Sequence, residues 1–286
     1  MTFRVNDNML VVLKGADFSG DYIEKIDIGG LEAAVVNMLS NLTKYPPSSQ
    51  NAYAQALNTL YKGLVSDGLW SKLKLLCIPL MADTVSEVLY DCATGVAENA
   101  NALRTYFGLN AKGELYNTTV VPVSTTLGFQ RTINPNDLTL FGCCSKSSGN
   151  QAITLISVSK HQYTFSAVSG ANFITSGNSV LGQVTLAGVP VTWNGGAMVQ
   201  RAFPGGAFVL SSKAGTVTYK DSTGSVQSTT SANETETHIL PLIVESGASG
   251  SVVPGSCGLF GAASGLTANE IAKLYDHISQ FYSAFN

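Results

Sequence analysis

Residues 49–79 read SQNAYAQALNTLYKGLVSDGLWSKLKLLCIP and decide how the rest of the chain is interpreted. Alanine and leucine recur at helical spacing in the first half of this stretch, which predicts a helix. Asp67-Gly68 interrupts the pattern, and leucines then return at the same spacing around Trp70 until Pro79 ends the run. We therefore expect a helix, a break, and a second helix that carries the tryptophan.

The segment upstream has the same helical character. Leucine, valine and methionine share one face between Leu31 and Leu42, and Pro46-Pro47 stops this pattern. Residues 31–83 are thus predicted to form a helical neck or hairpin. Trp70 is interpreted as the anchor that holds this hairpin to the following domain, and stacking on a ligand is the alternative.

The first thirty residues contain one apolar run, Met9–Leu13, between polar and glycine-rich segments. We expect residues 1–30 to form a short strand or an N-terminal arm that docks on a neighbouring subunit. A frayed end is the alternative.

Residues 84–286 have the pattern of a β domain. Turn sequences such as Asn194-Gly-Gly196 recur at short intervals, and the runs between them alternate apolar with polar residues. The first strand is expected around Glu87–Ala93. Many short strands without an intervening helix favour an antiparallel β-sandwich of the jelly-roll type.

A helix over residues 267–285 is predicted to close the chain. Thr267 and Glu270 have the spacing of a capping box, and a wide apolar stripe follows them. This stripe must be covered, either by the neck helices of the same chain or by another subunit.

Composition limits the classes of function. Asp, Glu, Lys and Arg make up 12% of the chain, and the net charge is −3, so nucleic-acid binding is disfavoured. The longest apolar stretch, Leu73–Met81, is too short to cross a bilayer, and the N-terminus does not resemble a secretory signal. The five cysteines are expected to be reduced and mostly buried, and adjacent Cys143 and Cys144 should lie on opposite faces of a strand.

The order of elements in residues 49–79 resembles a segment that recurs in tailed-bacteriophage virion proteins. In that segment an apolar helix, the motif K-G-L-V-S-D-G-L-W-S-K-L and an apolar run ending in proline precede a β-rich domain. The resemblance implies a structural subunit of a virion, and trimers are the commonest assembly among such fibres.

A second resemblance lies near the C-terminus. Residues 259–275, LFGAASGLTANEIAKLY, are similar to the closing signature of concanavalin A-like (laminin G-like) jelly rolls, in which a last strand leads into x-L-T-x-x-E-I-x-x-L-Y. This resemblance implies two curved antiparallel sheets, whose concave face or loop rim often binds glycan.

Catalytic motifs are scarce. Glycoside hydrolysis needs paired carboxylates, and the best pair, Glu234 and Glu236, lacks a middle aspartate and lies in a polar, loop-like run. The three histidines are far apart, and no nucleophile elbow or phosphate-binding loop is present. We expect no enzymatic activity, no cofactor and no metal site.

Sugar binding needs an exposed aromatic ring with polar groups beside it. Trp193 and Asn194, at a strand-to-turn junction, are the best candidates, with Tyr163, Gln200 and Arg201 as further members. Trp193 as a core residue of the sandwich is the competing interpretation.

The combined hypothesis is a tail, fibre or capsid-decoration subunit of a tailed phage. It would be made in the host cytoplasm, join other virion proteins as a homo-oligomer, and recognise a host-surface glycan. The residues expected to make assembly contacts are Leu10, Val12, Trp70, Tyr275, Phe281 and Phe285. A stand-alone carbohydrate-binding module and a glycoside hydrolase on the same fold are the alternatives.

Overall fold

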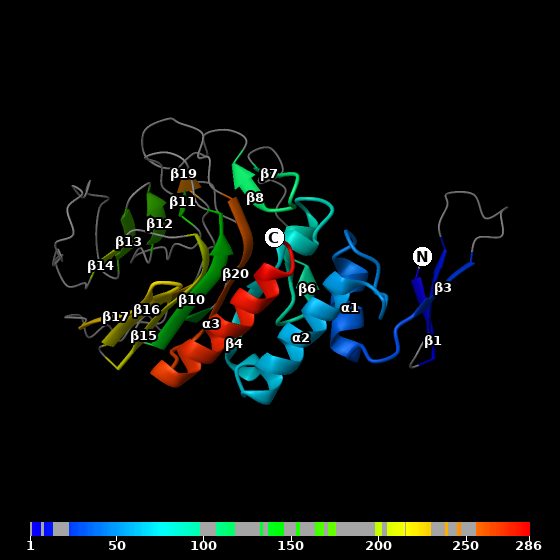
Figure 1. Ribbon diagram of the computed structural model, residues 1–286, viewed down its shortest axis with the longest axis horizontal. Coiled ribbons are helices and arrows are strands. Elements are labelled where there is room, and N and C mark those ends of the chain that lie inside the picture. The colour runs from blue at the N-terminus through cyan, green and yellow to red at the C-terminus, as the bar shows by residue number, and fades with distance from the viewer. Residues whose placement is uncertain are drawn as a thin grey trace.

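The computed structural model describes residues 27–97, 107–117, 137–145, 205–214, 216–229 and 256–286, together with the backbone of ten further short strands. The largest element is an antiparallel sheet of eight strands (Figure 1). Its order is β17 (Gly224–Thr229), β16 (Thr216–Asp221), β15 (Gly206–Lys213), β10 (Asp137–Cys144), β20 (Ser256–Ser264), β8 (Leu115–Asn117) and β7 (Phe107–Leu109), and β4 (Leu73–Cys77) also pairs with β20.

A second antiparallel sheet has five strands. Its order is β14 (Met198–Arg201), β13 (Ala171–Thr175), β12 (Thr164–Val168), β11 (Ile153–Thr154) and β19 (Glu245–Ser246). Strand β14 contacts β17, so the two large sheets meet at this edge.

Three smaller sheets complete the strands. The N-terminal sheet joins β1 (Thr2–Asn6), β2 (Met9–Leu13) and β3 (Ile23–Asp27). The pairs are β9 (Thr132–Ile133) with β18 (His238–Ile239) and β5 (Tyr90–Asp91) with β6 (Val96–Ala97).

The described residues contain three α-helices: α1 (Ala33–Asn41), α2 (Ala52–Ser66) and α3 (Ala268–Ser283). Helix α3 packs on β15 and β10, α2 packs beside α3, and α1 beside α2 (Figure 1). Local sequence fixes their starts, because Asn51 accepts hydrogen bonds from two backbone amides of α2, and Thr267 and Glu270 form the predicted capping box of α3. None of the helices in the described residues is long and apolar enough to span a bilayer.

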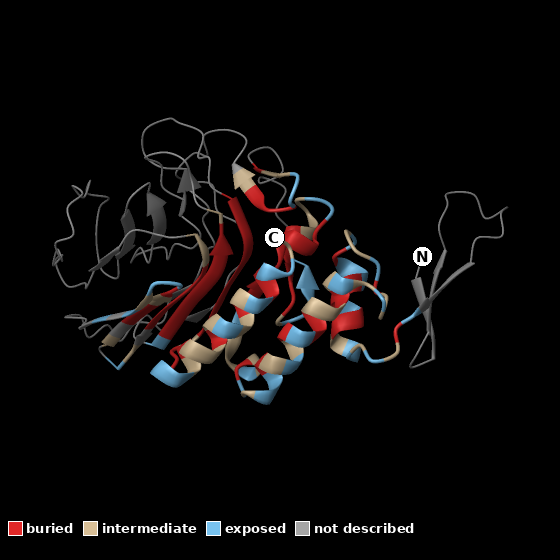
Figure 2. Cartoon of the chain, in the orientation of Figure 1, coloured by how far each residue is buried: buried red, intermediate tan, exposed pale blue. Residues whose placement is uncertain are grey.

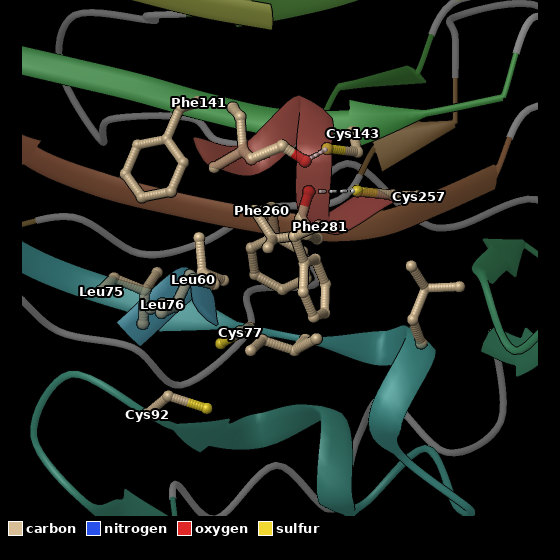
Figure 3. Packing of buried hydrophobic residues seen from close by; sticks show 14 of the residues in the cluster. Leu60, Leu75, Leu76, Cys77, Cys92, Phe141, Cys143, Cys257, Phe260 and Phe281 are labelled. Atoms are coloured by element: carbon tan, nitrogen blue, oxygen red, sulfur yellow. Dashed lines mark hydrogen bonds between the residues drawn. The ribbon is translucent and has the colours of Figure 1, made fainter. Parts of the chain in front are cut away.

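The core lies on both sides of β10. Residues 138–144 are all buried (Figure 2), which requires a layer on each face of the strand. Phe141 and Cys143 lie on the face toward α3, where the Cys143 thiol donates a 3.6 Å hydrogen bond to the carbonyl of Ile278 (Figure 3). Cys144 follows on the opposite face of the strand.

The cysteine prediction is confirmed. All five cysteines are buried and unbridged (Figure 3 labels four of them). Burial raises the pKa of the Cys143 and Cys144 thiols well above the ordinary value, so both stay protonated.

The predicted architecture is confirmed in outline: a mainly antiparallel β fold, a helical hairpin formed by α1 and α2, and a closing helix. The prediction of a second, tryptophan-bearing helix is wrong. Residues 70–72 make only a single turn of 3-10 helix, and the leucines that follow form strand β4. The apolar run is buried on both faces beside β20, and such a short run does not distinguish a strand from a helix.

The first predicted strand is also shifted. Residues 87–89 form a 3-10 turn, and only Tyr90–Asp91 of the expected segment is strand. The first strand of the eight-stranded sheet is instead β4, which lies inside the segment predicted as a helical neck.

Candidate functional site

The register of the five-stranded sheet places five residues in one line. Gln200 pairs with Phe173, Phe173 with Ser166, Ser166 with Thr154, and Thr154 with Glu245. Paired residues of adjacent strands share a face of the sheet, so this line combines an amide, an aromatic ring, two hydroxyls and a carboxylate. We name these five residues the polar row.

The neighbouring positions on the same face are of two kinds. Met198 pairs with Thr175, and Thr175 pairs with Thr164, which adds two hydroxyl-bearing residues on one side of the polar row. On its other side Val168 pairs with Ala171, and both are apolar. A sugar-binding face requires this combination of hydrogen-bonding groups around an aromatic residue.

The opposite face of the five-stranded sheet has a different composition. It has an apolar line, Val199, Ile174 and Phe165, and beside this line Arg201 pairs with Asn172. The polar row differs from it in having an aromatic residue, Phe173, with hydrogen-bonding residues paired on both neighbouring strands.

Only one of the residues that the sequence predicted for sugar binding lies in the polar row. Gln200 belongs to the polar row, whereas Arg201 lies one position further along β14, at the opposite face and paired with Asn172. Trp193, Asn194 and Tyr163 lie outside the described residues. Sequence reasoning missed the other four members of the row, although the alternation in β12 and β13 identifies which residues share a face.

The eight-stranded sheet provides no comparable face within the described residues. Its strand β10 is buried on both sides, and the polar groups there are already paired. The hydroxyls of Thr139 and Ser211 lie 2.8 Å apart, and Ser211 also accepts a 2.9 Å hydrogen bond from the backbone amide of Leu266. These groups stabilise the packing of the sheet against the start of α3.

Glu114 is the most heavily hydrogen-bonded acid in the described residues. Its carboxylate is 1% exposed and accepts hydrogen bonds from Tyr282 (2.6 Å), Ser145 (2.8 Å), Asn110 (3.0 Å) and Ser256. Burial alone would raise the pKa of this carboxyl group, but the four donors outweigh burial and lower it. We name this set the Glu114 cluster.

The Glu114 cluster is structural in character. It joins the turn before β8, the end of β10, the start of β20 and helix α3. Burial and the hydrogen bond to Glu114 raise the pKa of Tyr282, so its hydroxyl stays protonated and remains a donor. Because each carboxylate oxygen is already occupied, the cluster leaves no free acid for chemistry on a substrate.

Ion pairs connect the two segments on which the sequence resemblances rest. Asp67 accepts from Lys273 at 2.5 Å and lies 2.8 Å from His277, and Lys72 donates to Glu270 at 2.5 Å. The hydrogen bond from Lys273, followed by that with His277, lowers the pKa of Asp67. Together with the pairing of β4 and β20, these contacts make residues 67–77 and 260–277 one structural unit.

The aromatic residues predicted to make assembly contacts pack within their own chain. Phe281 is only 2% exposed, and Phe285 stacks on Tyr53 with ring centroids 4.6 Å apart. Tyr275 lies beneath the ammonium group of Lys220, and Trp70 packs edge-on against Tyr61 of α2.

The contact of Trp70 is with α2 itself, and its role as the anchor that holds the hairpin to the following domain stays a prediction. Leu10 and Val12 lie in β2, whose side chains are outside the description. Contact of any of these residues with another subunit stays a prediction.

Of the remaining sequence candidates for chemistry, Glu234, Glu236 and His161 lie outside the described residues. His277 is held by Asp67. Among the described residues, no three histidine, cysteine, aspartate or glutamate side chains gather as a metal site.

No protein-family model and no curated protein matches the chain. Solved structures of alginate lyases do match. A family 7 alginate lyase, A1-II', in complex with substrate has a TM-score of 0.37 and 9% identity, and covers 71% of this chain and 96% of its own. Another structure of alginate lyase A1-II', a member of polysaccharide lyase family 7, has a TM-score of 0.32 and 11% identity over 69% and 96% of the two chains.

This comparison corrects one expectation. Both solved structures are enzymes, which contradicts the prediction that the chain has no enzymatic character. Because the TM-scores are below 0.5, no residue role and no activity is transferred from them to this chain.

Proposed function

We propose that this protein engages polysaccharide through the face of its five-stranded sheet that carries the polar row. The single observation that carries the proposal is the polar row, in which Phe173 lies between Gln200 and Ser166. A sugar ring packs its C–H face on an aromatic side chain while its hydroxyls bind neighbouring amide, hydroxyl and carboxylate groups. The resemblance of the closing segment to concanavalin A-like jelly rolls supports the same class of ligand.

The proposal covers binding as well as processing of the polysaccharide.

A glycan microarray tests this function. The wild-type protein is expected to bind a defined set of polysaccharides, and Phe173→Ala to weaken that binding about tenfold through loss of the stacking surface. Tyr45→Ala is the matched control, because Tyr45 is a half-buried aromatic residue on the helical side of the molecule. Binding that is unchanged in Phe173→Ala, or lost equally in both variants, contradicts the proposal.

A second candidate function is a structural subunit of a tailed-phage virion, at the tail, a fibre or the capsid surface. The observation that favours it is the contact between the two resembling segments, since Lys72 of the first binds Glu270 of the second. The phage-like segment is thus built into the β domain, which matches the order of elements on which the resemblance rests.

Particle composition and oligomeric state test this second candidate. Antibodies against the protein are expected to label purified phage particles from a host that carries the gene. Light scattering is expected to give three times the mass of a single chain. Particles without the protein, or a monomer at micromolar concentration, would contradict the virion assignment and leave polysaccharide binding unaffected.

A further inference from the structure

Two cysteines are paired where strands β10 and β20 meet at one end of the eight-stranded sheet. Cys144 is the last residue of β10, and the register pairs it directly with Cys257 near the start of β20. Both residues are 1% exposed, and neither thiol is bridged. The backbone beside them is fixed, because the amide of Ser145 donates a 2.9 Å hydrogen bond to the carbonyl of Ser256.

We propose that Cys144 and Cys257 form a redox-sensitive crosslink, in which a disulfide joins the start of β20 to the end of β10. A disulfide requires Cα atoms about 4.4–6.8 Å apart, and directly paired residues of antiparallel strands have Cα atoms about 4.5–5.5 Å apart. The strand pairing therefore brings the two cysteines within range without a change of fold.

An irregularity in β20 lies at this pair. Cys143 pairs with Leu259 but Cys144 pairs with Cys257, so Gly258 is an extra residue at this point. A bulge of this kind bends its strand locally and re-aims the side chains beside it. Burial first, and then a hydrogen bond with the thiol of Cys257, raises the pKa of Cys144, which shows that the two thiols already interact. The thiol of Cys257 also donates a 3.2 Å hydrogen bond to the carbonyl of Leu259, and the disulfide would replace this contact.

A third thiol in this region differs in its partners. The register partner of Cys143 is Leu259, and its thiol donates to the carbonyl of Ile278 in α3. Cys143→Ser is thus a control next to the pair that leaves both proposed members in place.

The crosslink would close the part of the chain that contains the five-stranded sheet. Strands β11, β12, β13, β14 and β19 all lie between Cys144 and Cys257 in the chain. A bond between the two ends of this segment restricts the unfolded chain, and it also keeps the start of β20 from separating from β10. The oxidised protein is therefore expected to resist unfolding better than the reduced protein.

The crosslink forms by thiol–disulfide exchange with glutathione disulfide as the oxidant. Because both cysteines are buried, the oxidant reaches them only when this end of the sheet opens locally. One cysteine thiolate attacks glutathione disulfide and releases one glutathione, and the second cysteine thiolate attacks the mixed disulfide and releases the other. In total the two cysteines lose two electrons and two protons, and glutathione disulfide gains them.

Incubation of the full-length protein with glutathione disulfide tests the inference. Urea below the unfolding transition is included so that the end of the sheet can open. The protein is then unfolded and its free thiols are alkylated. Mass spectrometry is expected to find two of the five cysteines protected in the wild type. The same two should be protected in Cys143→Ser, and no intrachain disulfide should form in Cys144→Ser or Cys257→Ser.

Stability provides the second measurement. The oxidised wild type should unfold at a higher urea concentration than the reduced protein, and dithiothreitol should restore the lower midpoint. Alkylation of all five wild-type thiols would overturn the inference. So would a disulfide that forms in Cys144→Ser but not in Cys143→Ser, or an oxidised protein that unfolds at a lower urea concentration. Far-UV circular dichroism confirms that each variant is folded.

Discussion

The hydroxyl of Tyr282 donates a 2.6 Å hydrogen bond to Oε1 of Glu114, although the two residues are 168 positions apart. The same carboxylate accepts from Ser145 and Ser256, at the end of β10 and the start of β20. One buried charge therefore links helix α3 to three places in the eight-stranded sheet. Its removal should affect the whole domain.

Glu114→Gln is expected to lower the free energy of unfolding by about 2–4 kcal/mol. The amide replaces an acceptor by a donor in a cluster whose partners are already donors. Urea denaturation at neutral pH measures the change. Tyr282→Phe, which removes one hydrogen bond and keeps the ring, should cost about 1–2 kcal/mol. Equal midpoints for Glu114→Gln and wild type would show that the cluster does not stabilise the fold.

Acid should remove the contribution of Glu270 to the stability of the folded protein. The hydrogen bond from Lys72, opposed by burial and aided by the capping contacts with Thr267, lowers the pKa of Glu270 from 4.5 to about 2. A carboxyl group with a depressed folded-state pKa stabilises the protein above its unfolded pKa, and this contribution is lost as pH falls through the folded value.

The difference in unfolding free energy between wild type and Glu270→Gln should therefore be about 1–2 kcal/mol at neutral pH. It should shrink between pH 4.5 and pH 2. Glu32→Gln is the control, because Glu32 and Lys62 are 47% and 52% exposed in their 3.4 Å ion pair. If the difference in unfolding free energy between wild type and Glu270→Gln stays constant down to pH 2, the ionised Glu270 does not stabilise the fold.

The effect of Gly63→Ala on stability should depend on whether His277 is present. Alanine favours a helix over glycine by about 1 kcal/mol, but a Cβ at Gly63 of α2 would overlap the imidazole ring of His277. The substitution should displace the ring from Asp67 and give no net stabilisation in the wild type. In a His277→Ala background it should stabilise by about 1 kcal/mol. A double-mutant cycle with no coupling energy would show that the ring is not held at this position.

Gly261→Ala tests the pairing of β4 with β20. A Cβ at Gly261 would lie 2.5 Å from the backbone carbonyl oxygen of Leu75 and would also meet the ring of Phe141. Backbone cannot move aside as a flexible side chain can, so we expect a loss of about 2–4 kcal/mol by thermal or urea unfolding. Gly258→Ala, whose Cβ would first meet side-chain atoms of Leu80 and Tyr282, should cost less. The reverse order would argue against this strand pairing.

Local sequence predicted those elements whose determinants are local. The capping box of Thr267 and Glu270 lies within four residues, and the apolar stripes of α2 and α3 have enough turns to define a period. Strand β4 was missed because its five residues carry no clear period, and its partner β20 is far away in the chain.

The candidate site depended on relationships that no single segment contains. Phe173 and Gln200 become neighbours only through the register of β13 and β14, and register is set by turns and by burial. Ser145, Ser256 and Tyr282 are ordinary residues in their own segments, and only the folded chain brings them to Glu114.

The position of β20 has a consequence for synthesis. This strand lies between β10 on one side and β8 and β4 on the other, yet it follows all three of them in the chain. On the ribosome, the earlier strands cannot join into one sheet until residues 256–264 have been made. Until then the nascent polypeptide carries an open seam between β10 and β4.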